Sequence, residues 1–400
     1  MPKLRMRHAS LSLAVALCAA PSALAAQEAL TEQLAIERAL AREGIADLEA
    51  ASRDIAATGV ELVRPFDNPS LEVSRESVGG EREWQLGIVQ PIDLSGQRDA
   101  LRNAARSEVS AVESDIAWAR IGLIAQVRSA FVSCAAAGAE LAVWQNHATA
   151  LAEAERIAGA RAREGDTAVY DLRRTRVAAS SADAELSMAE GERAADCASL
   201  ASLTGLADPV VPPTAITSLR SGEVPGDRAD LAAQEQRLLA TSQRVVAARR
   251  SRVPQFSVGA GIKHVSDGMG SAVGPAVSVG VTLPIFDGGG AAVSQAQAQQ
   301  RALQAELAIA RRTVEAEQQA AAARANAARE AAVRAARSRD DAARLGQIAA
   351  IAYQSGEIGV VELLDAHAAQ RDAELAVIRH ATAAAQAAIA FDLATGRTAP

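Results

Sequence analysis

The chain has 400 residues, of which 49% are hydrophobic but only 2% aromatic, and its formal net charge at pH 7 is −7. Alanine therefore carries much of the apolar content, and the large side chains that fill a compact globular core are scarce. This composition favours long helices packed through small residues, and the acidic balance argues against a nucleic-acid partner.

Residues 1–25 predict a signal peptide. Basic residues precede an apolar run, and Ala23-Leu24-Ala25 offers a small-residue cleavage site. The mature chain therefore leaves the cytoplasm. Cys18 could carry a lipid anchor, but Leu17 before it is larger than the usual residue there, so simple cleavage is favoured. No uncharged apolar run of about 20 residues remains after the signal peptide, so we expect no transmembrane helix.

The rest of the chain is a tandem duplication, in which three short motifs recur in the same order. The pairs are Asn68-Pro69-Ser70-Leu71 with Val253-Pro254-Gln255-Phe256, Gln90-Pro91-Ile92-Asp93 with Leu283-Pro284-Ile285-Phe286, and Leu203-Thr204-Gly205 with Ala394-Thr395-Gly396. We therefore expect a first repeat over 26–206 and a second over 228–396. A proline-rich linker over 207–227 joins them.

Each repeat begins with a helix and continues with two segments that read as strands, at about 69–75 and 84–92 in the first repeat and 254–265 and 275–285 in the second. Apolar residues alternate in them with small or polar residues, which gives each strand one apolar face. The alternatives are a half-buried sheet and a membrane β-barrel. Since four strands cannot close a barrel of at least about eight, the barrel requires an oligomer.

A long helix without proline follows each strand pair, over 96–163 and 290–354, and a return helix follows each long helix, over 167–203 and 358–393. At 1.5 Å per residue each long helix reaches roughly 100 Å. Apolar residues of the second return helix recur at heptad spacing, so each helix pair is predicted to form a coiled-coil hairpin.

A glycine turn joins the two helices of each hairpin. The predicted tips are Gly165-Asp166-Thr167 and Gly356-Glu357-Ile358, since glycine tolerates the left-handed backbone that ends a helix. Beyond the second tip, Glu362 and Asp365 stand three residues apart and project from one helix face. By themselves these acids fit a solvated helix start that the helix dipole favours.

Cys134 and Cys197 lie at nearly equal distances before and after Gly165, so they fall nearly opposite each other in an antiparallel hairpin. The alternatives are a disulfide, which an oxidising compartment allows, and two small buried residues. The histidines show no metal-ligand spacing and no nucleophile stands with a base, so we expect no metal site, cofactor or enzymatic activity.

The duplicated order of elements resembles the TolC family of outer-membrane efflux proteins, as do several motifs. These are Asn68-Pro69-Ser70-Leu71, the segment from Gln90 to Arg98, Arg228-Ala229-Asp230-Leu231 and the Tyr353-x-x-Gly356 turn. The resemblance implies a mainly helical homotrimer. Its strands, four from each chain, would form one 12-stranded outer-membrane barrel above a periplasmic helical cylinder, with the linker in an equatorial belt.

The resemblance also implies a passive exit duct for small molecules or metal ions in a tripartite pump, with a periplasmic adaptor and an RND-type inner-membrane transporter as partners. The segment from Gln90 to Arg98 resembles the heavy-metal, CzcC-like branch. A duct for type I protein secretion and a periplasmic adaptor protein are the alternatives.

By position in the family, Glu362 and Asp365 correspond to acids that ring the periplasmic aperture, and Asp171 and Tyr353 to partners in the closed-state network. The two tips correspond to the adaptor-docking sites. Ile358 stands where the best-known members carry an arginine, so the same salt-bridged lock cannot form.

Overall fold

The computed structural model of the chain describes residues 29–165, 169–207, 209–213, 216, 228–267 and 269–397. The predicted signal peptide with Cys18, the tip residues Asp166 and Thr167, and most of the linker over 207–227 lie outside these residues.

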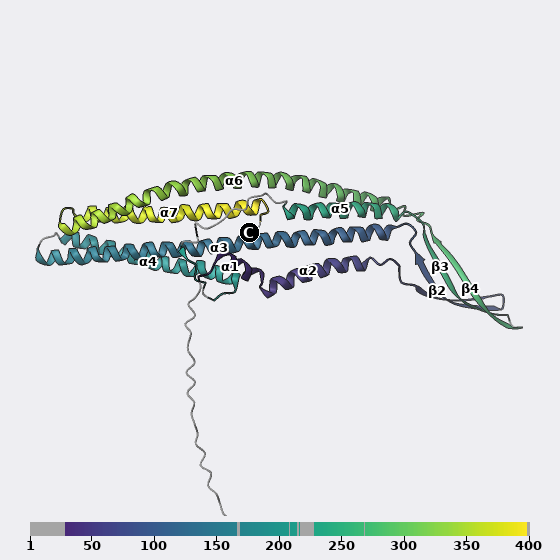
Figure 1. The fold of residues 1–400 in the computed structure, drawn as a ribbon. Coiled ribbons are helices and arrows are strands. Elements are labelled where there is room, and N and C mark those ends of the chain that lie inside the picture. The colour runs from purple at the N-terminus through teal and green to yellow at the C-terminus, as the bar shows by residue number, and fades with distance from the viewer. Residues whose placement is uncertain are drawn as a thin grey trace, which may run out of the picture.

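The molecule is an elongated helical bundle with a sheet at one end and two hairpin tips at the other (Figure 1). In chain order the elements are α1 (Glu32–Leu40), α2 (Glu43–Leu62), β1 (Ser70–Val78), β2 (Glu81–Ile92), α3 (Gln97–Glu164), α4 (Val169–Thr204), α5 (Ala229–Arg250), β3 (Gln255–Ser266), β4 (Ser271–Thr282), α6 (Gly290–Ser355) and α7 (Val360–Ala394). The long helices α3 and α6 have 68 and 66 residues and run from the sheet to the tips.

The strands form one antiparallel sheet in the order β1-β2-β3-β4, and the predicted bounds of three strands were wrong. β1 continues to Val78 rather than 75, and β2 begins at Glu81 rather than 84, because Gly79 and Gly80 at positive φ make a two-residue turn between paired strands. β4 covers 271–282 rather than 275–285. It includes Pro275, which an edge strand tolerates because its missing N–H faces away from the ladder.

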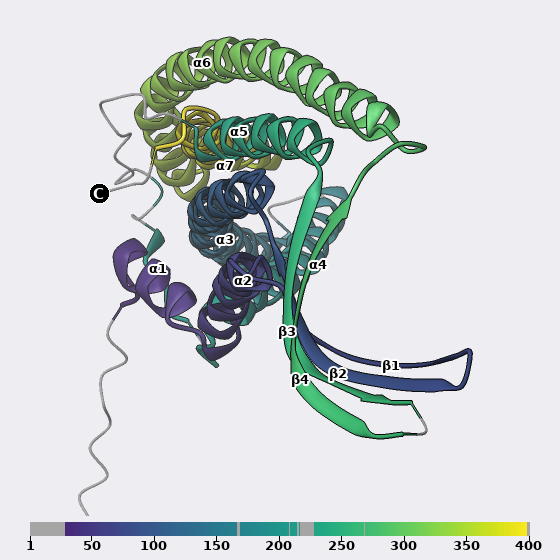
Figure 2. The same ribbon diagram turned by 90° about the vertical axis from the view of Figure 1, so that its right-hand side faces the viewer.

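The sheet is strongly curved (Figure 2), and its two faces differ. Gly261 lies opposite Gly87, and a Cβ at Gly261 would collide with the carbonyl oxygen of Leu86. Side chains converge on the inside of a bend, so the glycine-bearing face is the concave one. The opposite face carries large exposed apolar residues, namely Leu71, Val73, Leu86, Ile88, Val258, Ile262, Val273, Val277, Val279 and Val281. The convex face therefore has the apolar surface that lipid requires.

The main apolar core lies midway along the bundle. Val127, Phe131 and Val132 of α3 pack there with Leu200 of α4 and Ile389 of α7. One 18-residue window of α3, with mean hydropathy 1.4 and no more than two charged residues, is apolar enough to cross a membrane by length and composition, although it is not the uncharged run of about 20 residues considered above. Within the bundle 56% of this window is buried, which fits a core helix.

Candidate gate at the hairpin tips

Both tips are built by a left-handed glycine. Gly165 and Gly356 each have φ of 83°, which lets the last turn of α3 and of α6 close on itself. At the first tip the N–H of Gly165 donates to the carbonyl of Arg161. At the second, the N–H of Glu357 donates to the carbonyl of Ala352 at 2.8 Å, after which α7 begins.

Glu362 and Asp365 are exposed at the start of α7. The carboxylate of Glu362 folds back over the helix N-terminus, since a Cβ at Gly359 would lie only 2.9 Å from its Oε2. The positive end of the helix dipole favours a carboxylate there. Neither acid forms an ion pair with another residue of the described chain. Both carboxylates are therefore accessible to solvent and to dissolved ions at the tip.

Tyr353 and Asp171 are neighbours that share no hydrogen bond within the described chain. Tyr353 is only 3% exposed, and its buried hydroxyl meets no partner among the described residues. Burial is the main cause that raises the pKa of Tyr353; the charge of Arg161 opposes this rise, and the smaller effect of the Asp171 charge adds to it. The two residues that correspond by position to partners in a closed-state network therefore lie near each other but form no hydrogen bond with each other.

Ile358, at the position of the expected arginine, is half-buried against an apolar cluster rather than facing a charge. Ala154, Ala349, Tyr353, Val360, Leu363 and Ala366 form this cluster, with Ile157 of α3 beside it. The second tip is therefore fixed to the first hairpin by apolar contact.

Arg161 of α3 also links the two tips, and the sequence pattern did not single it out. Its Nη2 donates to the carbonyls of Tyr353 at 2.8 Å and Gln354 at 3.1 Å. Its guanidinium lies 4.9 Å from the centre of the Tyr353 ring. The available signal was an arginine one turn before Gly165, the glycine of its own tip.

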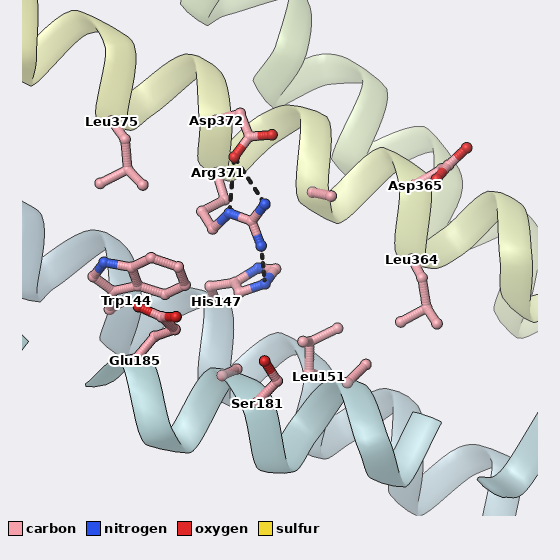
Figure 3. Close-up of a pocket in the computed structure, with 13 residues that line it drawn as sticks. Trp144, His147, Leu151, Ser181, Glu185, Leu364, Asp365, Arg371, Asp372 and Leu375 are labelled. Carbon is pink, nitrogen blue, oxygen red and sulfur yellow. Dashed lines mark hydrogen bonds and ion pairs between the residues drawn. The ribbon is translucent and has the colours of Figure 1, made fainter. Parts of the chain in front are cut away.

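A cavity of about 440 Å³ lies between α3, α4 and α7 beside Asp365 (Figure 3). At one end Arg371 donates from Nη1 to Nε2 of His147 at 3.2 Å and lies 5.3 Å from the centre of the Trp144 ring. Burial, and then the charge of Arg371, lower the pKa of His147 to about 4, so the imidazole is neutral and can accept this bond. The cavity wall is thus a polar junction between the two hairpins.

Away from the tips, Cys134 and Cys197 form a disulfide in the structure, with Cα atoms 4.7 Å apart. It joins α3 to α4 beside the main apolar core.

The chain matches the family model described as outer membrane efflux protein over residues 46–206 and 223–397. A similar curated protein is the cobalt-zinc-cadmium resistance protein CzcC of Cupriavidus metallidurans. It is 25% identical over 370 residues, which cover 88% of this chain and 87% of the relative.

Solved structures with the same fold include CusC, with a TM-score of 0.77 at 19% identity over 92% of each chain. The open state of the MtrE channel of Neisseria gonorrhoeae has a TM-score of 0.74 at 21% identity, covering 92% of this chain and 89% of that one. The resemblance and the fold class expected from the sequence are therefore confirmed. The chain belongs to the outer membrane efflux protein family, a family of transport channels, and is an outer-membrane exit duct with a periplasmic helical barrel.

Proposed function

We propose that three copies of this chain form a duct for heavy-metal cations, which an RND-type transporter and a periplasmic adaptor deliver to it. The observation that carries this proposal is the unpaired acid pair Glu362 and Asp365 at the tip. The similarity to a relative named for cobalt, zinc and cadmium resistance supports the class of cargo.

Assembly into a trimer is supported by surfaces that one chain leaves uncovered. Strands β1 and β4 each have a free edge, and four strands are too few to close a barrel. On α2, Leu48, Ile55 and Leu62 are spaced by seven residues and are 69%, 75% and 77% exposed. Such a stripe fits burial against a helix of a neighbouring copy.

The concave face of the sheet adds negative charge. Glu76 and Glu83 lie directly opposite each other on β1 and β2, and Glu72 lies opposite Gly87 on the same face. Lys263 forms an ion pair with Glu83 at 2.5 Å, which leaves carboxylates in excess on this face. If the concave face lines the barrel, its charge favours the passage of cations, as the tip carboxylates would at the other end.

The aperture is tested by the double variant Glu362→Gln/Asp365→Asn in planar bilayers. We expect weaker cation selectivity and weaker block by multivalent cations, because three chains would lose a ring of carboxylates. The matched control is Asp340→Asn/Asp341→Asn, which removes two exposed carboxylates from α6 away from the tip. If block by multivalent cations is unchanged in the tip variant, these acids do not line the aperture.

The cargo is tested in a host that lacks its own metal-efflux duct. With the cognate adaptor and transporter present, this chain should restore tolerance to zinc, cobalt or cadmium. Restored dye efflux without any gain in metal tolerance would contradict the proposed cargo but would agree with a role as an efflux duct.

We also propose that the tips dock the adaptor, through Gly165 and the exposed turn at Gly356 and Glu357. Asp166 and Thr167 belong to this proposal but lie outside the described residues. A photo-crosslinking residue at Glu357 should capture the adaptor in cells. The same crosslinking residue at the exposed Glu330, which lies within α6 and several helical turns from the tip, should not capture the adaptor.

A further inference from the structure

We propose that Arg161 is a latch that holds the second hairpin tip against the first within each protomer, and so sets how readily the aperture opens. The inference rests on the proposed gate at the tips. Arg161 would be a positioning residue, since it acts on the backbone and ring of the opposite tip rather than on cargo.

The bonds of Arg161 cross from one repeat to the other. The arginine lies in the last turn of α3, and its acceptors are carbonyls in the last turn of α6, 192 and 193 residues away in sequence. Carbonyls in the last turn of a helix lack intrahelical donors, so they are strong candidates for an outside donor. A cation at this end also meets the negative pole of the helix dipole.

The same guanidinium covers a buried aromatic ring. It lies 4.9 Å from the centre of Tyr353, whose hydroxyl is buried and has no partner within the described chain. Two charge-assisted hydrogen bonds and a cation–π contact therefore meet on one side chain. Separation of the tips would break all three together and expose the ring.

The latch differs from a salt-bridged lock in its acceptors. These are backbone carbonyls, so the latch does not depend on an acidic residue in the opposite tip. This difference fits a tip in which Ile358 stands at the position of the expected arginine and packs against apolar neighbours.

The test is Arg161→Met in reconstituted trimers. Methionine keeps an unbranched apolar stem but removes the donors and the charge. We expect roughly a ten-fold rise in the ratio of open to closed dwell time, because the variant loses two charge-assisted hydrogen bonds and a cation–π contact. Arg161→Lys should fall between this variant and the wild type, because a lysine keeps the charge but lacks the planar guanidinium. Trimer melting is followed in parallel to show that the variants fold.

The matched control is Arg163→Met. Arg163 carries the same charge on the same helix turn, is exposed, and makes no hydrogen bond or ion pair with the described residues. Arg161→Met trimers with wild-type dwell times would overturn the latch, as would an equal effect of Arg163→Met. Block by multivalent cations, measured in the same bilayers, tests the acidic aperture separately, so the latch can fail while the proposed gate stands.

Discussion

The two long helices α3 and α6 have nearly equal lengths of 68 and 66 residues, yet they have different surroundings. α3 buries large side chains such as Ile121, Phe131 and Leu151, whereas the buried positions of α6 are fewer and mostly small or medium-sized. On α6, Ile309, Ile348 and Ile351 are 65%, 66% and 69% exposed. Helices of nearly equal length therefore have different environments in this molecule.

Position in the layer of helices explains this difference. α3 packs against α1, α2, α4, α5 and α7, whereas α6 packs mainly against α5 and α7 at one rim of the protomer (Figure 2). The inner helix supplies the core of a single chain. The outer helix carries surface that the protomer alone leaves exposed, which supports the proposal that a second copy covers it.

The largest expected difference between the two helices is at Arg128. This arginine of α3 is 2% exposed and pairs with Asp392 of α7 at 2.8 Å and Glu32 of α1 at 2.5 Å. Asp392→Ala should lower the unfolding free energy by about 3–5 kcal/mol, because it leaves a buried cation with one fewer partner. Thermal unfolding in detergent, followed by circular dichroism, measures it.

The control for that prediction lies on α6. The ion pair between Arg334 and Glu330 has side chains that are 74% and 67% exposed. Glu330→Ala should therefore change the unfolding free energy by no more than about 0.5 kcal/mol. Equal losses in the two variants would mean that α3 is not the more deeply packed helix.

The disulfide gives the second prediction, because only the first hairpin has one in the described chain. Cys134→Ser/Cys197→Ser should destabilise the protein by about 2–4 kcal/mol, since the bond closes a long loop in the unfolded chain. A thermal melt with and without reductant measures this loss. Two free thiols in the denatured, unreduced protein would show that the bond does not form.

Local features of this molecule could be predicted from the sequence, and long-range contacts could not. The helix ends at Gly165 and Gly356 follow from a backbone conformation that glycine favours, and the strand alternation follows from a period of two. The long helices begin and end within two residues of the positions expected from the sequence. Each of these depends on neighbours in the chain.

The candidate site was harder for the same reason. Arg161 meets Tyr353 across 192 residues, Arg128 meets Asp392 across 264, and Arg371 meets His147 across 224. Which side chains meet is decided by the rotation of each helix about its axis, and an alanine-rich seam leaves many rotations consistent with the same pattern. Glu362 and Asp365 could be found because their spacing lies within one helix.

The third prediction concerns the buried junction on α3. The pKa of His147 is about 4 in the folded protein against 6.5 ordinarily, mainly through burial, with Arg371 and His367 adding repulsion and Asp372 opposing them. The unfolded chain therefore binds a proton first as pH falls. Stability should be full above pH 6.5 and decline by up to about 3 kcal/mol between pH 6.5 and 4.

Melting temperatures across that pH range test this prediction. His147→Gln, which cannot titrate but can still accept from Arg371, should flatten the decline. His380→Gln, the same change at a half-buried histidine of α7 outside this junction, is the control. If the melting temperature of the His147 variant falls as steeply with decreasing pH as that of the wild type, groups other than His147 cause the decline.

The smallest expected effect on a single chain is at the exposed isoleucines of α6. Ile348→Ser/Ile351→Ser should change the stability of a monomer in detergent by about 0.5 kcal/mol or less, because both side chains already face solvent there. In the trimer the same change should weaken association, since each isoleucine that becomes fully buried contributes about 1.5–3 kcal/mol.

The control is Leu239→Ser on α5. This leucine is 53% exposed but lies on a helix enclosed between α3 and α6, so its replacement should leave association unchanged. Sedimentation across a dilution series separates the two effects, and an α6 variant that dissociates no earlier than the wild type would show that the exposed face of α6 is not the one that meets a second copy.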